Sequence, residues 1–282
     1  MKASRFFLAQ YLHLPLGRSR PTRLGLLCAI GLWSFAPTNA GAQNPVQHDQ
    51  QAVTILNQTI AAGGGQQQLA TIQDFTETGT ITHNFAEPVT GNVTVKSRGL
   101  HQVRIDADFP KGRRTTVVNG EGGSLKQADG RNWPIYRQSA NDLGSLTLPY
   151  LPLIAAIQDS ATSIVYGGLV THNGASAYDI RLQKVYTKQQ DPSENRGTRE
   201  ARDFYIDPNT FLVASVSDQV HFGGGPHDKG VPHEVLYSNY QSEDGIMTPL
   251  TIVETARGVT GLTMNLSQVT FNSGLADSDF AW

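Results

Sequence analysis

The feature that most constrains this chain is a long strand-like stretch between residues 204 and 271. Its last run, GLTMNLSQVTF, alternates Leu262, Met264 and Leu266 with polar residues. An alternation of period two gives a strand one apolar face and one polar face, as in a half-buried antiparallel strand. Turn residues separate the runs: DPNT at 207–210 predicts a type I turn, and SEDG at 242–245 follows the next run. The stretch therefore predicts a meander of long hairpins.

Runs of the same kind occur in the earlier part of the chain. They lie at residues 75–82, 92–96, 101–108, 115–118, 124–127 and 178–183. Together with the C-terminal meander they give roughly ten or eleven strands. The predicted fold class is mainly β with minor α: a strongly curved antiparallel sheet with one or two helices on its concave side, or a barrel.

Two segments predict helices. Residues 47–62 place Val53, Leu56 and Ile60 on one face, with Asp49 as the N-cap and GGG at 63–65 ending the helix. Residues 146–157, LTLPYLPLIAAI, are apolar on every side, and Pro152 sits where a helix can begin. A short helix without a polar face must be buried or must face a cavity.

Residues 1–42 have the layout of a secretory signal peptide. Five basic residues precede an apolar run at 24–36, and an Ala-Gly-Ala pattern ends at Ala42. The alternative is an uncleaved anchor, although the run is shorter than the about 20 residues that span a membrane. Cys28, the only cysteine, lies inside the run after Leu27, which argues against a lipidated cysteine. Residues 43–282 then form a single cysteine-free β domain.

The charge balance narrows the class of partner. Cleavage after Ala42 removes five basic residues and no acidic one, so the formal charge changes from −2 to −7. An acidic chain is a poor match for nucleic acid or for an anionic membrane surface. The sequence therefore predicts an exported, periplasmic protein that does not bind nucleic acid.

A group of histidines is the strongest hint of metal chemistry. His221, His227 and His233 lie in one segment beside Asp228 and Glu234, and histidine is a common metal ligand. However, the segment HFGGGPHDKGVPHE is rich in Gly and Pro, whereas a metal site needs rigid support around its ligands. A metal-dependent hydrolase that uses this loop is therefore the second alternative to the function given below, and no metal site or cofactor is expected.

A pair of carboxylates is the other candidate for catalysis. Asp106 and Asp108 are two residues apart on one strand, so they share a face, as in a pair that hydrolyses glycosides. They alternate with Val103, Ile105 and Ala107, which places them on the wet face. The sequence also contains no G-x-S-x-G, HExxH or phosphate-loop motif. These observations predict that the protein is not an enzyme.

An apolar set in the middle of the chain has two interpretations. It is either ordinary core, or the lining and lid of an apolar ligand cavity under a curved sheet. The members are Trp133, Tyr136, Tyr150, Leu151, Leu153 and Ile154.

Three segments resemble the outer-membrane lipoprotein-sorting proteins, the LolA/LolB-like superfamily. FYIDPNTFLVASV is similar to their strand–turn–strand, and VLYSNYQSEDGIMTPLTI is similar to the following hairpin, with Tyr237, Tyr240, Gly245 and Pro249 in place. The ending VTFNSGLADSDFAW also fits. The resemblance is strongest over residues 204–280. It implies an unclosed, half-barrel-like sheet whose concave side is plugged by helices over an apolar cavity.

The resemblance also implies a function, which is to carry acyl chains of lipids or lipoproteins through the periplasm. Partners would be those acyl chains and an inner- or outer-membrane protein that loads or receives them. The first alternative is an integral outer-membrane β-barrel or an assembly scaffold. Trp282 at the chain end favours the barrel, whereas ADSD at 276–279 interrupts its final strand and the strands lack aromatic girdles.

Overall fold

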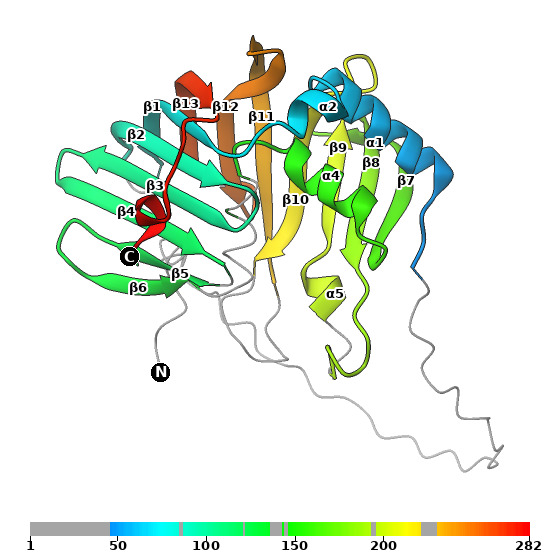
Figure 1. The fold of residues 1–282 in the computed structure, drawn as a ribbon, viewed down its shortest axis with the longest axis horizontal. Coiled ribbons are helices and arrows are strands. Elements are labelled where there is room, and N and C mark those ends of the chain that lie inside the picture. Colours follow the sequence, from blue (N-terminus) through cyan, green and yellow to red (C-terminus); the bar gives the residue numbers. More distant parts are fainter. Residues whose placement is uncertain are drawn as a thin grey trace, which may run out of the picture.

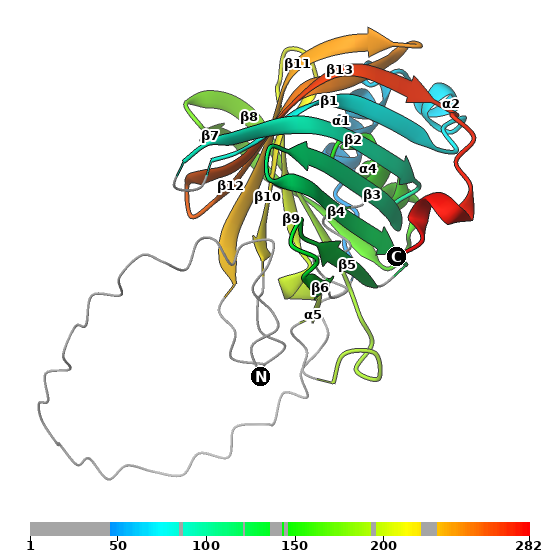
Figure 2. The same cartoon turned by 90° about the vertical axis from the view of Figure 1, so that its left-hand side faces the viewer.

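The structure is a computed structural model that describes residues 46–84, 87–120, 122–135, 143, 146–192, 196–220 and 230–282. The signal-peptide prediction for residues 1–42 lies outside these ranges. The described residues form one antiparallel sheet of 13 strands. Helices α1 (Gln50–Ala62), α2 (Gln66–Leu69) and α4 (Tyr150–Gln158) lie on one side of it (Figure 1). Figure 2 shows the strands curving round the side that α1 and α4 occupy.

With one exception, strands that pair in the sheet are consecutive in the sequence. They are β1 (Phe75–His83), β2 (Val89–Arg98), β3 (Gln102–Phe109), β4 (Gly112–Asn119), β5 (Gly122–Lys126), β6 (Asn132–Ile135), β7 (Thr162–His172), β8 (Ala175–Lys184), β9 (Arg202–Ile206), β10 (Val213–Val220), β11 (Val231–Glu243), β12 (Ile246–Ala256) and β13 (Val259–Phe271). Their order is β6-β5-β4-β3-β2-β1-β13-β12-β11-β10-β9-β8-β7. Strand β13 returns to pair with β1 and joins the two halves of the sheet.

The predicted fold class is confirmed, and the sheet is not closed: β6 and β7 are its two ends. The meander of residues 204–271 forms β9 to β13, and Leu262, Met264 and Leu266 are buried on its inner face. The sequence prediction missed β6 and β7. Pro134 interrupts the pattern of β6, and Gly167-Gly168 interrupts that of β7, where the register shifts between Tyr166 and Gly168.

The turn after β9 follows its sequence signal, with one difference. Asp207 Oδ1 accepts hydrogen bonds from the backbone N–H groups of Asn209 (2.7 Å) and Thr210 (3.0 Å). The turn is one residue longer than the predicted type I turn, because the Phe211 N–H donates to the Asp207 carbonyl (2.8 Å). Phe211 takes the left-handed conformation (φ 57°) that this longer turn requires.

Helix α1 is the helix predicted for residues 47–62. The Asp49 carboxylate caps it by accepting from the N–H groups of Gln51 (2.8 Å) and Ala52 (3.3 Å). Leu56 and Ile60 are buried as predicted, while Val53 lies at the edge of the buried face. The glycine run ends the helix, with the Gly63 N–H donating to the Thr59 carbonyl (2.9 Å).

Helix α4 forms within the predicted apolar segment, but it begins at Tyr150 rather than at Pro152. Pro152 fits the first turn because N–H groups there have no partner within the helix. The residues before the helix are not helical, and Leu146 and Leu148 are buried. Leu153 shares its core cluster with Leu56 of α1 and Ile81 of β1, so both helices pack on the concave face.

A short helix, α5 (Arg196–Arg199), precedes β9, and the buried Asp191 carboxylate accepts a hydrogen bond from the Arg196 N–H (2.6 Å). The chain ends in the short 3-10 helix η2 (Asp277–Phe280), where the buried ring of Phe280 lies 5.2 Å from the Arg98 guanidinium carbon.

Candidate ligand-binding site

Helix α1 is fastened to the sheet at both ends by backbone hydrogen bonds. At its start, the Asp49 N–H donates to the Ile164 carbonyl (2.9 Å), and the Ile164 N–H donates to the Gln47 carbonyl (2.7 Å). At its end, the Met247 N–H donates to the Gly63 carbonyl (3.0 Å). The helix therefore runs from β7 to β12, and backbone hydrogen bonds hold both of its ends to the sheet.

Helix α4 is fastened differently at its two ends. At the C-terminal end, the Asp159 carboxylate accepts from the Ala161 N–H (3.0 Å) and the Thr162 hydroxyl (2.9 Å) and pairs with Lys184 (3.1 Å). At the N-terminal end, no side chain among the described residues caps the first turn. That end is held by packing of the buried Tyr150 ring.

Gly63 is required by this packing. Its φ of −69° is ordinary, so the reason is space rather than backbone conformation. A Cβ at residue 63 would lie 2.6 Å from the Tyr150 ring. The Tyr150 hydroxyl lies near the Tyr240 hydroxyl. The Tyr240 hydroxyl donates a hydrogen bond to the Val213 carbonyl (2.7 Å).

The structure describes five of the six residues of the predicted apolar set, and four of them lie on α4. Tyr150 and Leu153 are fully buried, and Leu151 and Ile154 are half-buried against the cluster that contains Tyr150. Trp133 lies on β6 and packs against the main core, and Tyr136 lies outside the described residues. The hollows described next are lined by other residues, so a cavity role for these six stays a prediction.

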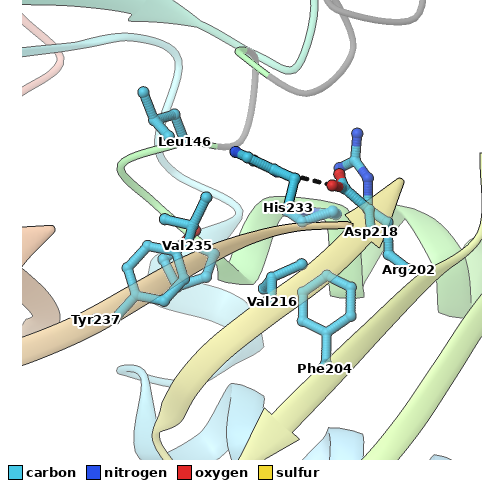
Figure 3. Close-up of a pocket in the computed structure, with 10 residues that line it drawn as sticks. Leu146, Arg202, Phe204, Val216, Asp218, His233, Val235 and Tyr237 are labelled. Carbon is cyan, nitrogen blue, oxygen red and sulfur yellow. Dashed lines mark hydrogen bonds and ion pairs between the residues drawn. The ribbon is translucent and has the colours of Figure 1, made fainter. Parts of the chain in front are cut away.

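Two hollows open on the concave face beside the start of α4. We call the first the Arg202 hollow. It is lined by Leu146, Pro149, Pro152, Arg202, Phe204, Val216, Asp218, His233, Val235 and Tyr237. Figure 3 shows Leu146 and His233 reaching toward this space from opposite sides.

The second, which we call the Arg114 hollow, lies against the other half of the sheet. It is lined by Ile81, His83, Ile105, Ala107, Arg114, Thr116, Leu146, Leu262 and Met264. Leu146 lines both hollows. In each hollow, the volume that the centre of a water molecule can occupy is about 20 Å³. This volume holds about one water, and it is far smaller than the volume that an acyl chain needs.

A buried ion cluster forms the polar wall of the Arg202 hollow. His233 Nδ1 lies 2.7 Å from Asp218 Oδ1, and its Nε2 lies 3.0 Å from Glu254 Oε1. Burial disfavours the charged ring, but the hydrogen bonds and charges of the two carboxylates raise the pKa of His233 well above its usual value. A protonated ring donates to both carboxylates, so the cluster is a buried cation between two anions.

The polar wall of the Arg114 hollow has a different character. Arg114 Nη1 lies 3.1 Å from His83 Nε2. Burial and the nearby Arg114 charge lower the pKa of His83 to about 4, so at neutral pH the ring is neutral and its Nε2 accepts from the guanidinium. Burial also lowers the pKa of Arg114 to about 10, against the attraction of Glu254, and Arg114 stays charged at neutral pH.

A buried carboxyl lies under the segment that leads into α4. Glu77 of β1 is fully buried, and neither of its carboxyl oxygens has a hydrogen-bond partner among the described residues. Burial raises its pKa to about 8, against the nearby Thr147 side chain, which lowers it. At neutral pH the group is therefore mostly a neutral acid. Any movement that lifts the Thr147 segment off the sheet would expose Glu77 to water and favour its ionisation.

The structure describes part of the histidine segment and both members of the carboxylate pair. Only His233 of the three histidines is described, and no three His, Cys, Asp or Glu side chains of the described ranges are grouped as metal ligands. Asp106 bonds Arg104 (2.7 Å) and Thr115 (2.6 Å), while Asp108 pairs with Arg113 (2.7 Å). The prediction that both carboxylates lie on the outer face is confirmed, since Ile105 and Ala107, which alternate with them along β3, are buried.

The sequence analysis missed most of the inward-facing ions, although a signal for them exists. Asp218 lies in phase with Val216 and Val220, and Glu254 lies in phase with Ile252 and Ala256. A charged residue at the apolar phase of a strand is rare unless it has a buried partner. Arg114 on β4 lines one hollow, and Asp218 on β10 and His233 on β11 line the other.

Comparison with solved structures agrees with this geometry. The LolA superfamily protein NE2245 from Nitrosomonas europaea is 12% identical with a TM-score of 0.51, and the match covers 82% of this chain and 97% of that one. A DUF1329 family protein from Desulfovibrio piger is 12% identical with a TM-score of 0.50, covering 81% and 96%. No protein-family model matches the chain, and no curated protein matches its sequence.

These two likenesses show the fold alone: the chain is similar in fold to a LolA superfamily protein and to a DUF1329 family protein. The resemblance in the sequence is thereby confirmed at the level of fold. In the described part of the chain, no helix has the length and apolar character needed to cross a membrane.

Proposed function

We propose that this protein is an exported, non-enzymatic carrier that holds the acyl chains of a lipid or lipoprotein between the concave face of the sheet and helix α4. A membrane protein would load the chain or receive it. The observation that carries the proposal is the pair of hollows that share Leu146, beside the end of α4 that no side chain of the described residues caps.

The proposed mechanism is burial of hydrocarbon. Each CH₂ group that leaves water for an apolar space contributes about 0.8 kcal/mol. Because the hollows are small, the segment that carries Leu146 must move outward to admit a chain. An acyl chain can replace the apolar contacts that this segment gives up, whereas it cannot replace broken backbone hydrogen bonds.

Substitution of Leu146 tests the location of the site. We expect Leu146→Trp to fill both hollows and to weaken binding of dodecanoic acid at least about tenfold, measured by native mass spectrometry titration. We expect Leu146→Ala to join the hollows and to bind at least as tightly as the natural chain. Leu169→Trp is the matched control, because Leu169 is 59% exposed on β7. Equal binding by the two Trp variants would place the site elsewhere.

Export is tested separately. We expect the protein recovered from the periplasm of its cells to begin at Gln43, as measured by mass spectrometry of the intact chain. A chain that keeps residues 1–42 and stays with the membrane fraction would show that the segment is an anchor instead.

A further inference from the structure

The two hollows differ in the charge of their walls. In the Arg202 hollow the cationic groups Arg202 and His233 lie with the anion Asp218 (Figure 3). In the Arg114 hollow, Arg114 is the only charged side chain among the described residues that line it, because His83 is neutral at neutral pH. Most of the remaining wall is apolar.

The guanidinium of Arg114 is held in place by its neighbours. The 3.1 Å contact with the neutral His83 ring uses one N–H group, and the charge of Glu254 on β12 attracts the guanidinium. Arg114 has further interactions within the protein. A guanidinium carries five N–H donors in a fixed plane, so it can serve protein partners and a ligand together.

A cation at the end of an apolar hollow favours a particular ligand chemistry. Attraction between opposite charges is much stronger in a partly buried site than in water. Arginine also matches the geometry of carboxylate and phosphate groups, which accept two parallel N–H bonds. Ile81, Ile105, Leu262 and Met264 supply the apolar wall beside it.

We infer that the Arg114 hollow binds the anionic head group of a single-chain amphiphile, with Arg114 on the head group and the acyl chain along the apolar wall toward Leu146. This inference rests on the proposed carrier function and adds a preference to it: the cargo carries a negative charge at the end of its chain.

The test compares two ligands of equal chain length, dodecanoate and 1-dodecanol, at neutral pH. We expect the natural protein to bind dodecanoate at least about tenfold more tightly, and Arg114→Gln to reduce that ratio to about one. Arg114→Lys keeps the charge and should keep part of the preference. Arg113→Gln is the matched control, because Arg113 is the next residue, is exposed and pairs with Asp108 on the outer face. Circular dichroism and thermal unfolding confirm that each variant is folded.

The outcomes separate the two proposals. Equal binding of dodecanoate and dodecanol by the natural protein, or a preference that survives Arg114→Gln, overturns the head-group inference and leaves the carrier function standing. Binding of neither ligand overturns both. Acetate is the remaining comparison: if acetate without a chain displaces dodecanoate at equal concentration, the site recognises a free anion and not an amphiphile.

Discussion

Helices α1 and α4 lie side by side on the concave face, yet they are attached by different forces. Helix α1 has a carboxylate cap and backbone hydrogen bonds to the sheet at both ends. Helix α4 has polar contacts at Asp159, while packing of Tyr150 holds its start. This difference predicts which part of the proposed cover moves. We expect the start of α4 to leave the sheet at the cost of apolar contacts, which an apolar ligand would restore.

The largest expected effect concerns the carboxyl beneath the segment before α4. A buried acid whose pKa rises from 4.5 to about 8 destabilises the folded state progressively as pH rises between those values. The cost is absent below pH 4.5 and constant above pH 8. At pH 7 it amounts to about 3 kcal/mol. We therefore expect Glu77→Gln to raise the free energy of unfolding in urea at pH 7 and to leave it nearly unchanged at pH 4.5.

The same substitution tests whether α1 and α4 respond differently to pH. Raising the pH toward 8 should speed amide hydrogen exchange at the start of α4, after correction for the intrinsic pH dependence, and should leave α1 unchanged. Glu77→Gln should remove this pH dependence. If α1 and α4 respond alike to pH, the two helices open as one unit and the proposed difference between them is wrong.

The junction between the helices gives the next effect. Gly63→Ala places a Cβ against the fully buried Tyr150 ring, and overpacking of this kind costs about 1–3 kcal/mol. We expect thermal unfolding at a lower temperature and faster hydrogen exchange at the start of α4. Gly122→Ala is the control, because among the described residues a Cβ there would meet only the Ile135 carbonyl oxygen, at 3.9 Å. A stable Gly63→Ala variant with unchanged exchange would show that Tyr150 does not anchor the helix.

Loss of the α1 cap should have the smallest effect. Asp49→Ala removes a carboxylate that accepts two backbone hydrogen bonds, at a cost of about 1 kcal/mol. Binding of dodecanoate should not change, because the backbone bonds to Ile164 still hold the start of α1. Gln50→Ala, at an exposed position in the same turn, is the control. A large loss of binding in Asp49→Ala alone would assign α1 a direct part in uptake.

Much of the fold could be predicted from local sequence patterns. The alternation in β3 and β13, the Asp49 cap and the Asp207 turn each depend on residues close in sequence. Because the interactions that form these elements are local, the amino-acid sequence alone is sufficient to predict them. Strand β7 was not predicted because Gly167-Gly168 breaks its alternation of apolar and polar residues. Its place at the end of the sheet follows from its pairing with β8.

The candidate site was harder to predict because distant strands build it. Leu146 lines one hollow together with Arg114 of β4 and the other together with His233 of β11. No spacing in the sequence relates these three residues. The apolar character of residues 146–157 correctly indicated a segment without a free polar face. Which of its residues line a hollow depends on where α4 begins, and the helix begins before Pro152.

The most direct test of the carrier account is native mass spectrometry of the protein purified from the periplasm of its own cells without detergent, followed by lipid extraction. We expect a major species whose mass exceeds that of the chain by one acyl-chain compound, and we expect the extracted compound to carry a negative charge. A protein that has only its own mass, and that takes up neither dodecanoate nor dodecanol when these are added, would contradict the account.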